Sequence, residues 1–178
     1  MIPRLEREAL RRDVVETLRP RIERLGYLGE FFKCAAHQPS ALMSFMAFTE
    51  DLKRALPDRI TETVALTVST EMANPYERHQ HERLSLTLGF GEQWIREVES
   101  LETSAASLTD NERAVQVLTL AVMRRQGHGT SKELEAVVGA IGHEQAIAVL
   151  MLIGRYVTHA LMVNALELQP PVPSPLAG

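Results

Sequence analysis

The chain has 178 residues, of which 45% are hydrophobic and 24% are charged, a balance typical of one globular domain with a buried core. The formal net charge is −4, with basic and acidic residues interspersed. This argues against a broad nucleic-acid-binding face but leaves room for a small anionic substrate. The single cysteine, Cys34, excludes an internal disulfide and a C-x-x-C redox pair, and we expect it to be a small core residue.

The spacing of the apolar residues predicts helices nearly everywhere and no convincing strand, so we expect an all-α fold. In chain order, the expected helices cover residues 4–24, 39–56, 59–72, 75–88, 92–101, a segment from about 110, a segment from about 131, and 144–166. Pro20 is expected to break or bend the first of these, and Pro57 to end the second.

Four polar residues stand where helices are expected to begin and can cap them: Asp58, Asn74, Thr109 and Thr130. After Asn74, Pro75 falls at the first helical position and Glu77 at the third, the position of a capping box. Thr109 and Thr130 are each followed three residues later by a glutamate, which predicts two further capping boxes.

The last expected helix, residues 144–166, is apolar around most of its circumference, so it lies either in the core or between subunits. The longest apolar stretch, 146–153, is too short to span a bilayer, and the N-terminal residues lack the apolar run of a secretory signal. We expect a cytoplasmic protein with one domain over residues 1–168 and no membrane or nucleic-acid partner. The Pro-rich tail, residues 169–178, is expected to be loose or draped over a neighbour.

Candidate chemistry lies between residues 56 and 89. Spacings of three and four place Asn74, Glu77 and His81 on one helix face. If this helix and the preceding one form an antiparallel hairpin, Glu62 and His81 can approach each other. A carboxylate beside an imidazole fixes the tautomer of the imidazole, which is the arrangement that general acid–base chemistry needs.

Structural roles for the same residues stay open on spacing alone. Glu77 can simply cap its helix, Glu62 can be a first-turn residue favoured by the helix dipole, and His81 can be a hydrogen-bonded core histidine. His159, on the apolar last helix, either points into a pocket or is a satisfied core histidine. The pair His79 and His81 points some 200° apart on a helix and has no further ligands, so we expect no metal site.

Three short stretches carry a resemblance to a known family: Leu56-Pro57-Asp58-Arg59-Ile60-Thr61-Glu62, Tyr76-Glu77-Arg78-His79-Gln80-His81 and Leu88-Gly89-Phe90. They resemble the carboxymuconolactone decarboxylase family, which commonly reads L-P-x-R-x-x-E and then Y-E-W-x-x-H; Arg78 stands where that family usually has Trp. Ala36-His37-Gln38-Pro39 matches a frequent A-H-x-P element of these proteins, and the resemblance extends over about residues 27–168.

The wider alkylhydroperoxidase D-like superfamily includes thiol peroxidases whose site reads E-x11-C-x2-C-x3-H. On this chain the pattern falls on Glu62, Asn74, Glu77 and His81, so both cysteine positions hold other residues. A thiol mechanism needs one thiolate to attack and a second to resolve, which disfavours peroxidase activity here.

The resemblance implies an alkylhydroperoxidase D-like helical fold with a central antiparallel helix hairpin, assembled as a homo-oligomer, usually a trimer or hexamer. It implies a cofactor-free lyase of aromatic compound degradation that decarboxylates or isomerises a small carboxylated lactone or related acid. His81 would be the proton donor or shuttle and Glu62 would orient it. Substrate contacts would come from Tyr76, Glu77, Arg59 and Arg78. The alternative is a non-catalytic member of the fold that binds a small ligand or a partner.

Overall fold

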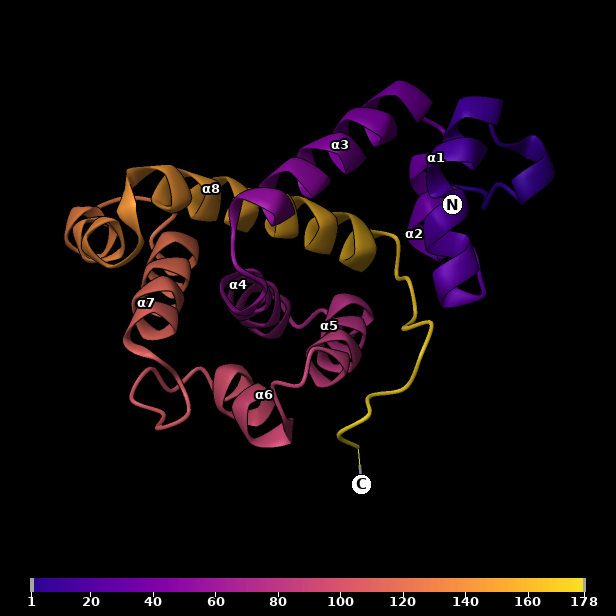
Figure 1. Cartoon of the computed structure of the whole chain (residues 1–178). Helices are drawn as coiled ribbons and strands as arrows, with labels where there is room; N and C mark the ends of the chain where they lie inside the picture. The colour runs from indigo at the N-terminus through magenta and orange to yellow at the C-terminus, as the bar shows by residue number, and fades with distance from the viewer. Residues whose placement is uncertain (1, 178) are drawn as a thin grey trace.

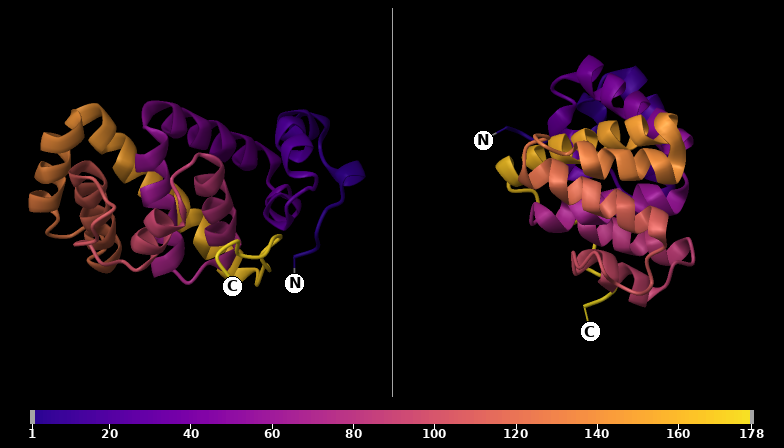
Figure 2. Two further views of the ribbon diagram at one scale, coloured as in Figure 1. Left: turned by 60° about the horizontal axis from the view of Figure 1, so that its bottom comes forward. Right: turned by 90° about the vertical axis from the view of Figure 1, so that its left-hand side faces the viewer.

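The computed structural model describes residues 2–177, and in that range the chain is all-helical, as predicted (Figure 1). The elements are a short 3-10 turn η1 (Arg7–Ala9) and the helices α1 (Arg12–Leu25), α2 (Glu30–Ala35), α3 (Pro39–Ala55), α4 (Asp58–Glu71), α5 (Pro75–Thr87), α6 (Glu92–Glu99), α7 (Asp110–Arg124) and α8 (Ser131–Ala165). The molecule is elongated, with α1 and α2 at one end and α7 with the first part of α8 at the other (Figure 2).

Helix α4 lies at the centre of the molecule (Figure 1). It packs against α5, α6, α7 and α8, and its residues 60–69 are buried without interruption. A helix covered on every side is a core helix, whatever its amphipathicity. Glu62 therefore lies in the protein interior, with only 2% of its surface exposed.

Helices α4 and α5 form the expected hairpin. The turn between them contains Ala73, whose backbone is left-handed (φ 48°). Asn74 caps α5 by accepting a hydrogen bond from the backbone N–H of Glu77 (3.3 Å), and Pro75 begins the helix. The predicted capping box is incomplete, because the Glu77 carboxylate turns away from the cap towards α8. The hairpin thus brings the first turns of α4 beside the middle of α5.

Helix α8 bends at Gly142, whose backbone (φ 81°, ψ 167°) is not helical. The bend separates residues 131–141 from 143–165, in agreement with the two separate helix starts predicted from the sequence. By length and hydropathy alone α8 would suit a membrane span, but more than half of its most apolar window is buried inside the molecule. That burial is the pattern of a core helix.

The other predictions about helix ends and breaks have mixed outcomes. Pro20 lies inside α1, which continues through it; the proline is exposed, so water can bind the backbone carbonyl that loses its donor. Asp58 is the first helical residue of α4 and makes no cap, since Pro57 takes the cap position. Thr109 forms its capping box with Glu112, whereas the Thr130 hydroxyl donates to Gly127 instead.

The Pro-rich tail is folded back on its own chain and contacts α5 and α6. The carbonyl of Val172 lies 3.1 Å from His79 Nδ1 on α5, and Ser174 donates a hydrogen bond to Glu82. The carbonyl of Leu176 accepts from Arg96 on α6 (3.2 Å). The tail thereby covers the outer side of α5 and α6.

Candidate active site

Glu62 of α4 and His81 of α5 form a buried pair. Glu62 Oε2 lies 2.6 Å from His81 Nδ1, and the side chains are 2% and 8% exposed. Ser85, one turn further along α5, adds a weaker hydrogen bond to the same carboxylate oxygen (3.5 Å). The approach expected for a hairpin is thus confirmed, and the Glu62 carboxylate fixes the proton of the neutral imidazole on Nδ1.

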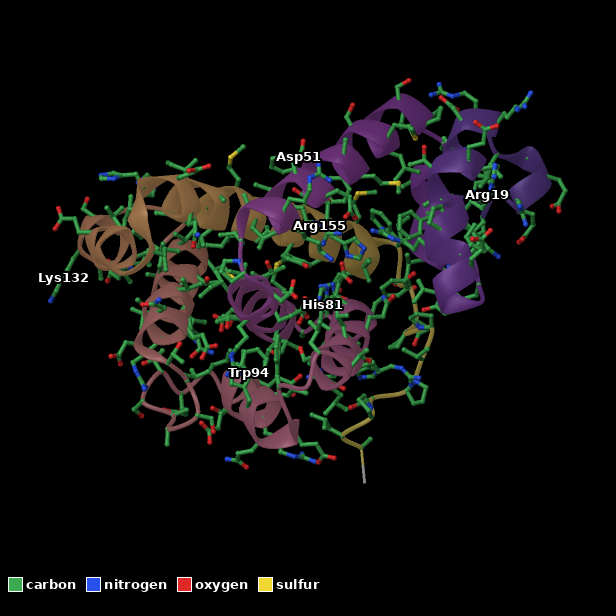
Figure 3. All side chains as sticks on the ribbon, in the orientation of Figure 1. Arg19, Asp51, His81, Trp94, Lys132 and Arg155 are labelled. Carbon is green, nitrogen blue, oxygen red and sulfur yellow. The ribbon has the colours of Figure 1, made fainter. Side chains whose placement is uncertain are left out.

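Glu77 lies on the other side of the imidazole. Its Oε2 is 3.7 Å from His81 Nε2, too long for a hydrogen bond. Its Oε1 accepts a hydrogen bond from Arg155 (3.1 Å) and lies 3.2 Å from His159 Nδ1. Figure 3 shows Arg155 and His81 reaching into the same region from α8 and α5. Glu77 is therefore part of a buried ionic cluster and is more than a helix cap.

The charge state of this cluster follows from its surroundings. Burial alone would raise the pKa of Glu77, but the cations around it outweigh burial, and its pKa lies well below the ordinary value. Burial lowers the pKa of His159 to about 4, although Glu77 opposes the shift. His159, Arg155 and His81 all act to lower the pKa of Glu77. Because His159 is neutral near pH 7, the Arg155 guanidinium is the permanent positive charge beside Glu77.

Arg155 is itself held by neighbours from three helices. Its Nε donates to the Thr49 hydroxyl on α3 (3.0 Å). Its guanidinium lies over the rings of Phe45 (5.1 Å) and Tyr156 (4.3 Å). A charged group with this many contacts is fixed in position, so α3, α5 and α8 are tied together at the site.

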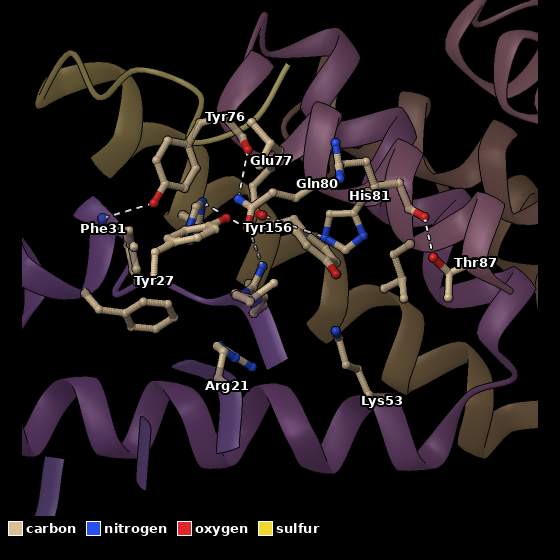
Figure 4. A pocket seen from close by; sticks show the side chains of 18 residues that line it. Arg21, Tyr27, Phe31, Lys53, Tyr76, Glu77, Gln80, His81, Thr87 and Tyr156 are labelled. Atoms are coloured by element: carbon tan, nitrogen blue, oxygen red, sulfur yellow. Dashed lines mark hydrogen bonds and ion pairs between the residues drawn. The ribbon is translucent and has the colours of Figure 1, made fainter. Parts of the chain in front are cut away.

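A cavity of about 390 Å³ opens beside these residues. Its aromatic wall is made by Tyr27, Phe31, Phe32, Tyr76 and Tyr156, and its charged groups are Arg21, Lys53, Glu77, Arg83 and Arg155. His81 and His159 also line it (Figure 4). Because Nδ1 of His81 is hydrogen-bonded to Glu62, Nε2 is the nitrogen available to a molecule in the cavity.

The other predicted site residues divide between the cavity and the surroundings. Tyr76 lines the cavity, and its hydroxyl accepts a hydrogen bond from the backbone of Phe31 (3.2 Å). Arg59 instead pairs with Glu112 on α7, and Arg78 lies 3.3 Å from Glu82. Neither arginine is among the cavity-lining residues, so we leave both out of the site.

Sequence spacing missed Lys53 and Arg155. Lys53 gave no signal, because it ends an ordinary amphipathic helix. Arg155 did give one, since it interrupts the apolar run of α8 and is followed by Tyr156 and His159 on the same buried side. A charge in the middle of such a run must find a buried partner.

The remaining candidates lie outside the site. Cys34 is buried in α2, as expected, and does not line the cavity; burial raises the pKa of its thiol. His37 lies 2.8 Å from the carbonyl of Pro3, and His128 and His143 are exposed. Among residues 2–177, no group of three His, Cys, Asp or Glu side chains is placed to hold a metal ion.

Neither a protein-family model nor a curated protein matches the sequence. Solved structures do match its fold. An uncharacterised peroxidase-related protein from Ralstonia eutropha JMP134, described as an alkylhydroperoxidase AhpD core, superposes with a TM-score of 0.82 at 18% identity, over 96% of this chain and 90% of that chain. A protein of unknown function from Agrobacterium tumefaciens, proposed to be an antioxidant defence protein AhpD, superposes with a TM-score of 0.71 at 22% identity. The match covers 78% of this chain and 96% of that chain.

The debrominase Bmp8 has the same fold. A cysteine-to-alanine variant of it in complex with 2,3,4-tribromopyrrole superposes with a TM-score of 0.81 at 13% identity, over 95% of this chain and 90% of that chain. At such identities the likeness shows the fold alone. The chain has the alkylhydroperoxidase D-like helical fold that the resemblance implied.

Proposed function

We propose that the chain is a cofactor-free enzyme that performs acid–base chemistry on a small carboxylated lactone or a related acid. The observation that carries the proposal is the buried Glu62–His81 pair, whose imidazole lines an aromatic-walled cavity. An imidazole oriented by a carboxylate can both accept and donate a proton at one fixed atom. The reaction class is decarboxylation or isomerisation, since both need one proton moved to or from carbon.

In the decarboxylation, the bond between the substrate and its carboxylate breaks and CO2 leaves. The electron pair stays on the substrate as a delocalised enolate. The protonated imidazole then donates its Nε2 proton to carbon, and water returns a proton to His81. Glu62 stabilises the imidazolium, because its carboxylate accepts a hydrogen bond from the Nδ1–H of His81.

The size of the cavity supports a small cyclic ligand. About 390 Å³ suits a single ring with one or two substituents. The debrominase Bmp8, which has the same fold, forms a complex with 2,3,4-tribromopyrrole, a substituted five-membered ring. The single cysteine lies outside the cavity, which disfavours thiol-based peroxide reduction as the activity of this site.

Binding without turnover is the second candidate function. It is favoured by the position of Glu77, which lies 3.7 Å from Nε2 and is locked there by Arg155, so that the imidazole has a carboxylate on each side. In that function the cluster would serve ligand recognition alone. The protein would then bind small acids and leave them unchanged.

Turnover assays separate the two functions. Lactone and muconate-type acids would be screened by ultraviolet absorbance with the wild type, His81→Ala and the exposed control His128→Ala. The proposal expects turnover that His81→Ala abolishes and His128→Ala retains, with unchanged helicity by circular dichroism. Equal turnover by His81→Ala would overturn the assignment. Peroxide consumption that depends on a thiol reductant would identify a peroxidase instead.

A further inference from the structure

We propose that Lys53 and Tyr156 form the binding site for a carboxylate of the substrate and hold it against His81. The inference deepens the proposed function and rests on it for the identity of the ligand as a small carboxylic acid. Neither residue has a part in the proton transfer described above. Both line the cavity, from α3 and α8 respectively.

Lys53 is an ammonium group without an ion pair at close range, and the carboxylates of Glu62 and Glu50 attract it only from further away. Among residues 2–177, no carboxylate lies within ion-pair distance of it and no hydrogen bond links it to another group. The other two lysines differ: Lys33 pairs with Glu6 at 3.0 Å and Glu30 at 3.4 Å, and Lys132 is exposed. Burial lowers the pKa of Lys53, as expected for a cation withdrawn from water. Lys53 is partly exposed and lines the cavity, so an anion that binds there can pair with its ammonium group.

Tyr156 offers the second donor. It is 2% exposed, and its hydroxyl has no hydrogen-bond partner among the described residues. Buried hydroxyl groups are almost always hydrogen-bonded in folded proteins, so this one indicates an acceptor that enters with the ligand. Its ring touches His81 edge-on, with the two ring centres 5.2 Å apart.

The charge of the cavity points to an anion. Its lining contains four basic side chains, Arg21, Lys53, Arg83 and Arg155, and one acidic side chain, Glu77. Arg155 is already paired with Glu77, and Arg21 with Glu50. The chain as a whole has a net charge of −4, so this positive lining is a local feature. Lys53 and Arg83 are the two lining cations without an ion pair among the described residues, and Figure 4 shows Lys53 directed towards His81.

The chemistry fixes which carboxylate is held. An ammonium that bound the departing carboxylate would stabilise the charge that decarboxylation removes, and would slow CO2 loss. Lys53 and Tyr156 therefore bind a carboxylate that the product retains. One ammonium and one hydroxyl supply a donor for each carboxylate oxygen, which orients the ring of the acid relative to Nε2 of His81.

Binding can be measured without turnover. The probe is 2-furoate, a planar five-membered ring with a carboxylate, and its neutral match is furan-2-carboxamide. Calorimetric titration would compare the wild type, Lys53→Met, Lys53→Arg, Tyr156→Phe and the exposed control Lys132→Met. We expect the wild type to bind furoate more tightly than the amide. Lys53→Met should lose roughly 10-fold or more in furoate affinity, with little change in amide affinity. Lys53→Arg should keep part of the furoate affinity that Lys53→Met loses. Tyr156→Phe should lose several-fold, and Lys132→Met nothing.

A spectroscopic readout separates recognition from a packing role. The chain has three lysines, so selective carbon labelling at the ε position gives three side-chain signals. Furoate should raise the pKa of Lys53 and leave those of Lys33 and Lys132 unchanged, because only Lys53 gains a counter-charge. The proposal is overturned if wild type does not bind furoate at millimolar concentration, if it binds acid and amide equally, or if Lys53→Met weakens both alike.

The outcomes also separate this inference from the proposed function. Lys53-dependent binding of furoate, together with no His81-dependent turnover of any acid, would uphold the carboxylate site and reject the enzyme. Turnover that depends on His81, together with furoate binding that does not depend on Lys53, would uphold the enzyme and reject the carboxylate site.

Discussion

His81 Nδ1 and Glu62 Oε2 lie 2.6 Å apart in the interior, although 19 residues separate them in the chain. Replacing Glu62 with Gln keeps the shape but removes the charge that stabilises the imidazolium and can invert the tautomer. We expect kcat to fall by about 10²–10⁴-fold with little change in KM. Steady-state kinetics on the acid that the screen identifies would measure this, with His128→Ala as the control. An unchanged kcat would contradict a role for the pair.

The buried pair of Arg155 and Glu77 should be worth more to stability than any exposed pair in the molecule. Arg155→Met leaves the Glu77 carboxylate buried without its cation, which should cost about 3–5 kcal/mol of unfolding free energy. The exposed pair of Arg124 and Glu71 provides the control, since Arg124→Met should cost about 1 kcal/mol or less. Chemical denaturation would compare the two.

The double variant Arg155→Met with Glu77→Gln tests the reason for that loss. Removing the stranded charge should recover part of the lost stability, because the penalty comes from the unpaired carboxylate. Equal losses for the double and the single variant would mean that Arg155 acts through packing alone.

The sequence predicted the hairpin and its acid–base pair because both are local. The start of α5 is set by neighbouring residues, Asn74, Pro75 and Glu77. Glu62 and His81 lie on consecutive helices. Lys53 and Arg155 could not be placed in the same way, because α8 packs on α4, and α3 on α8, only in the folded chain. The continuity of α1 through Pro20 and the contacts of Val172 and Ser174 also depend on tertiary structure, which composition does not contain.

Among the glycines of α8, Gly142 should be the one whose replacement lowers stability most. At φ 81° an alanine is strained, although no atom lies within 4 Å of the added Cβ. We expect Gly142→Ala to lower the unfolding free energy by about 1–2 kcal/mol. Gly139, in the regular part of the same helix and equally open, is the matched control: Gly139→Ala should raise stability by roughly 0.5–1 kcal/mol. Effects of the same sign in both variants would contradict the bend as described.

The outer face of α8 should take part in self-association. Ile147, Met151 and Leu161 lie along one side of the helix and are 46–57% exposed. Apolar side chains gathered on one face commonly mark an interface. We expect a trimer or hexamer by light scattering, and a lower mass for Leu161→Glu. Leu88→Glu, at an exposed apolar residue elsewhere, should leave the mass unchanged. A monomeric wild type would refute the prediction.

The contact between α5 and α6 should weaken as the pH rises, because two carboxyl groups, Glu82 and Glu99, meet there. Burial and the neighbouring Glu82 raise the pKa of Glu99 to about 8, although Arg78 and Arg96 oppose the shift. The folded chain therefore keeps a proton on Glu99 that the unfolded chain releases near its ordinary pKa of 4.5. Stability from this group is complete below pH 4.5 and is lost as the pH rises to about 8.

Glu99→Gln should remove that dependence, because an amide stays neutral at every pH. The unfolding free energy of the variant, measured by denaturation between pH 5 and about 8.5, should then fall less with pH than that of the wild type. Glu144→Gln, at an exposed glutamate of α8, should leave the slope as it is in the wild type. Identical slopes for wild type and Glu99→Gln would show that Glu99 ionises in the fold as it does in water.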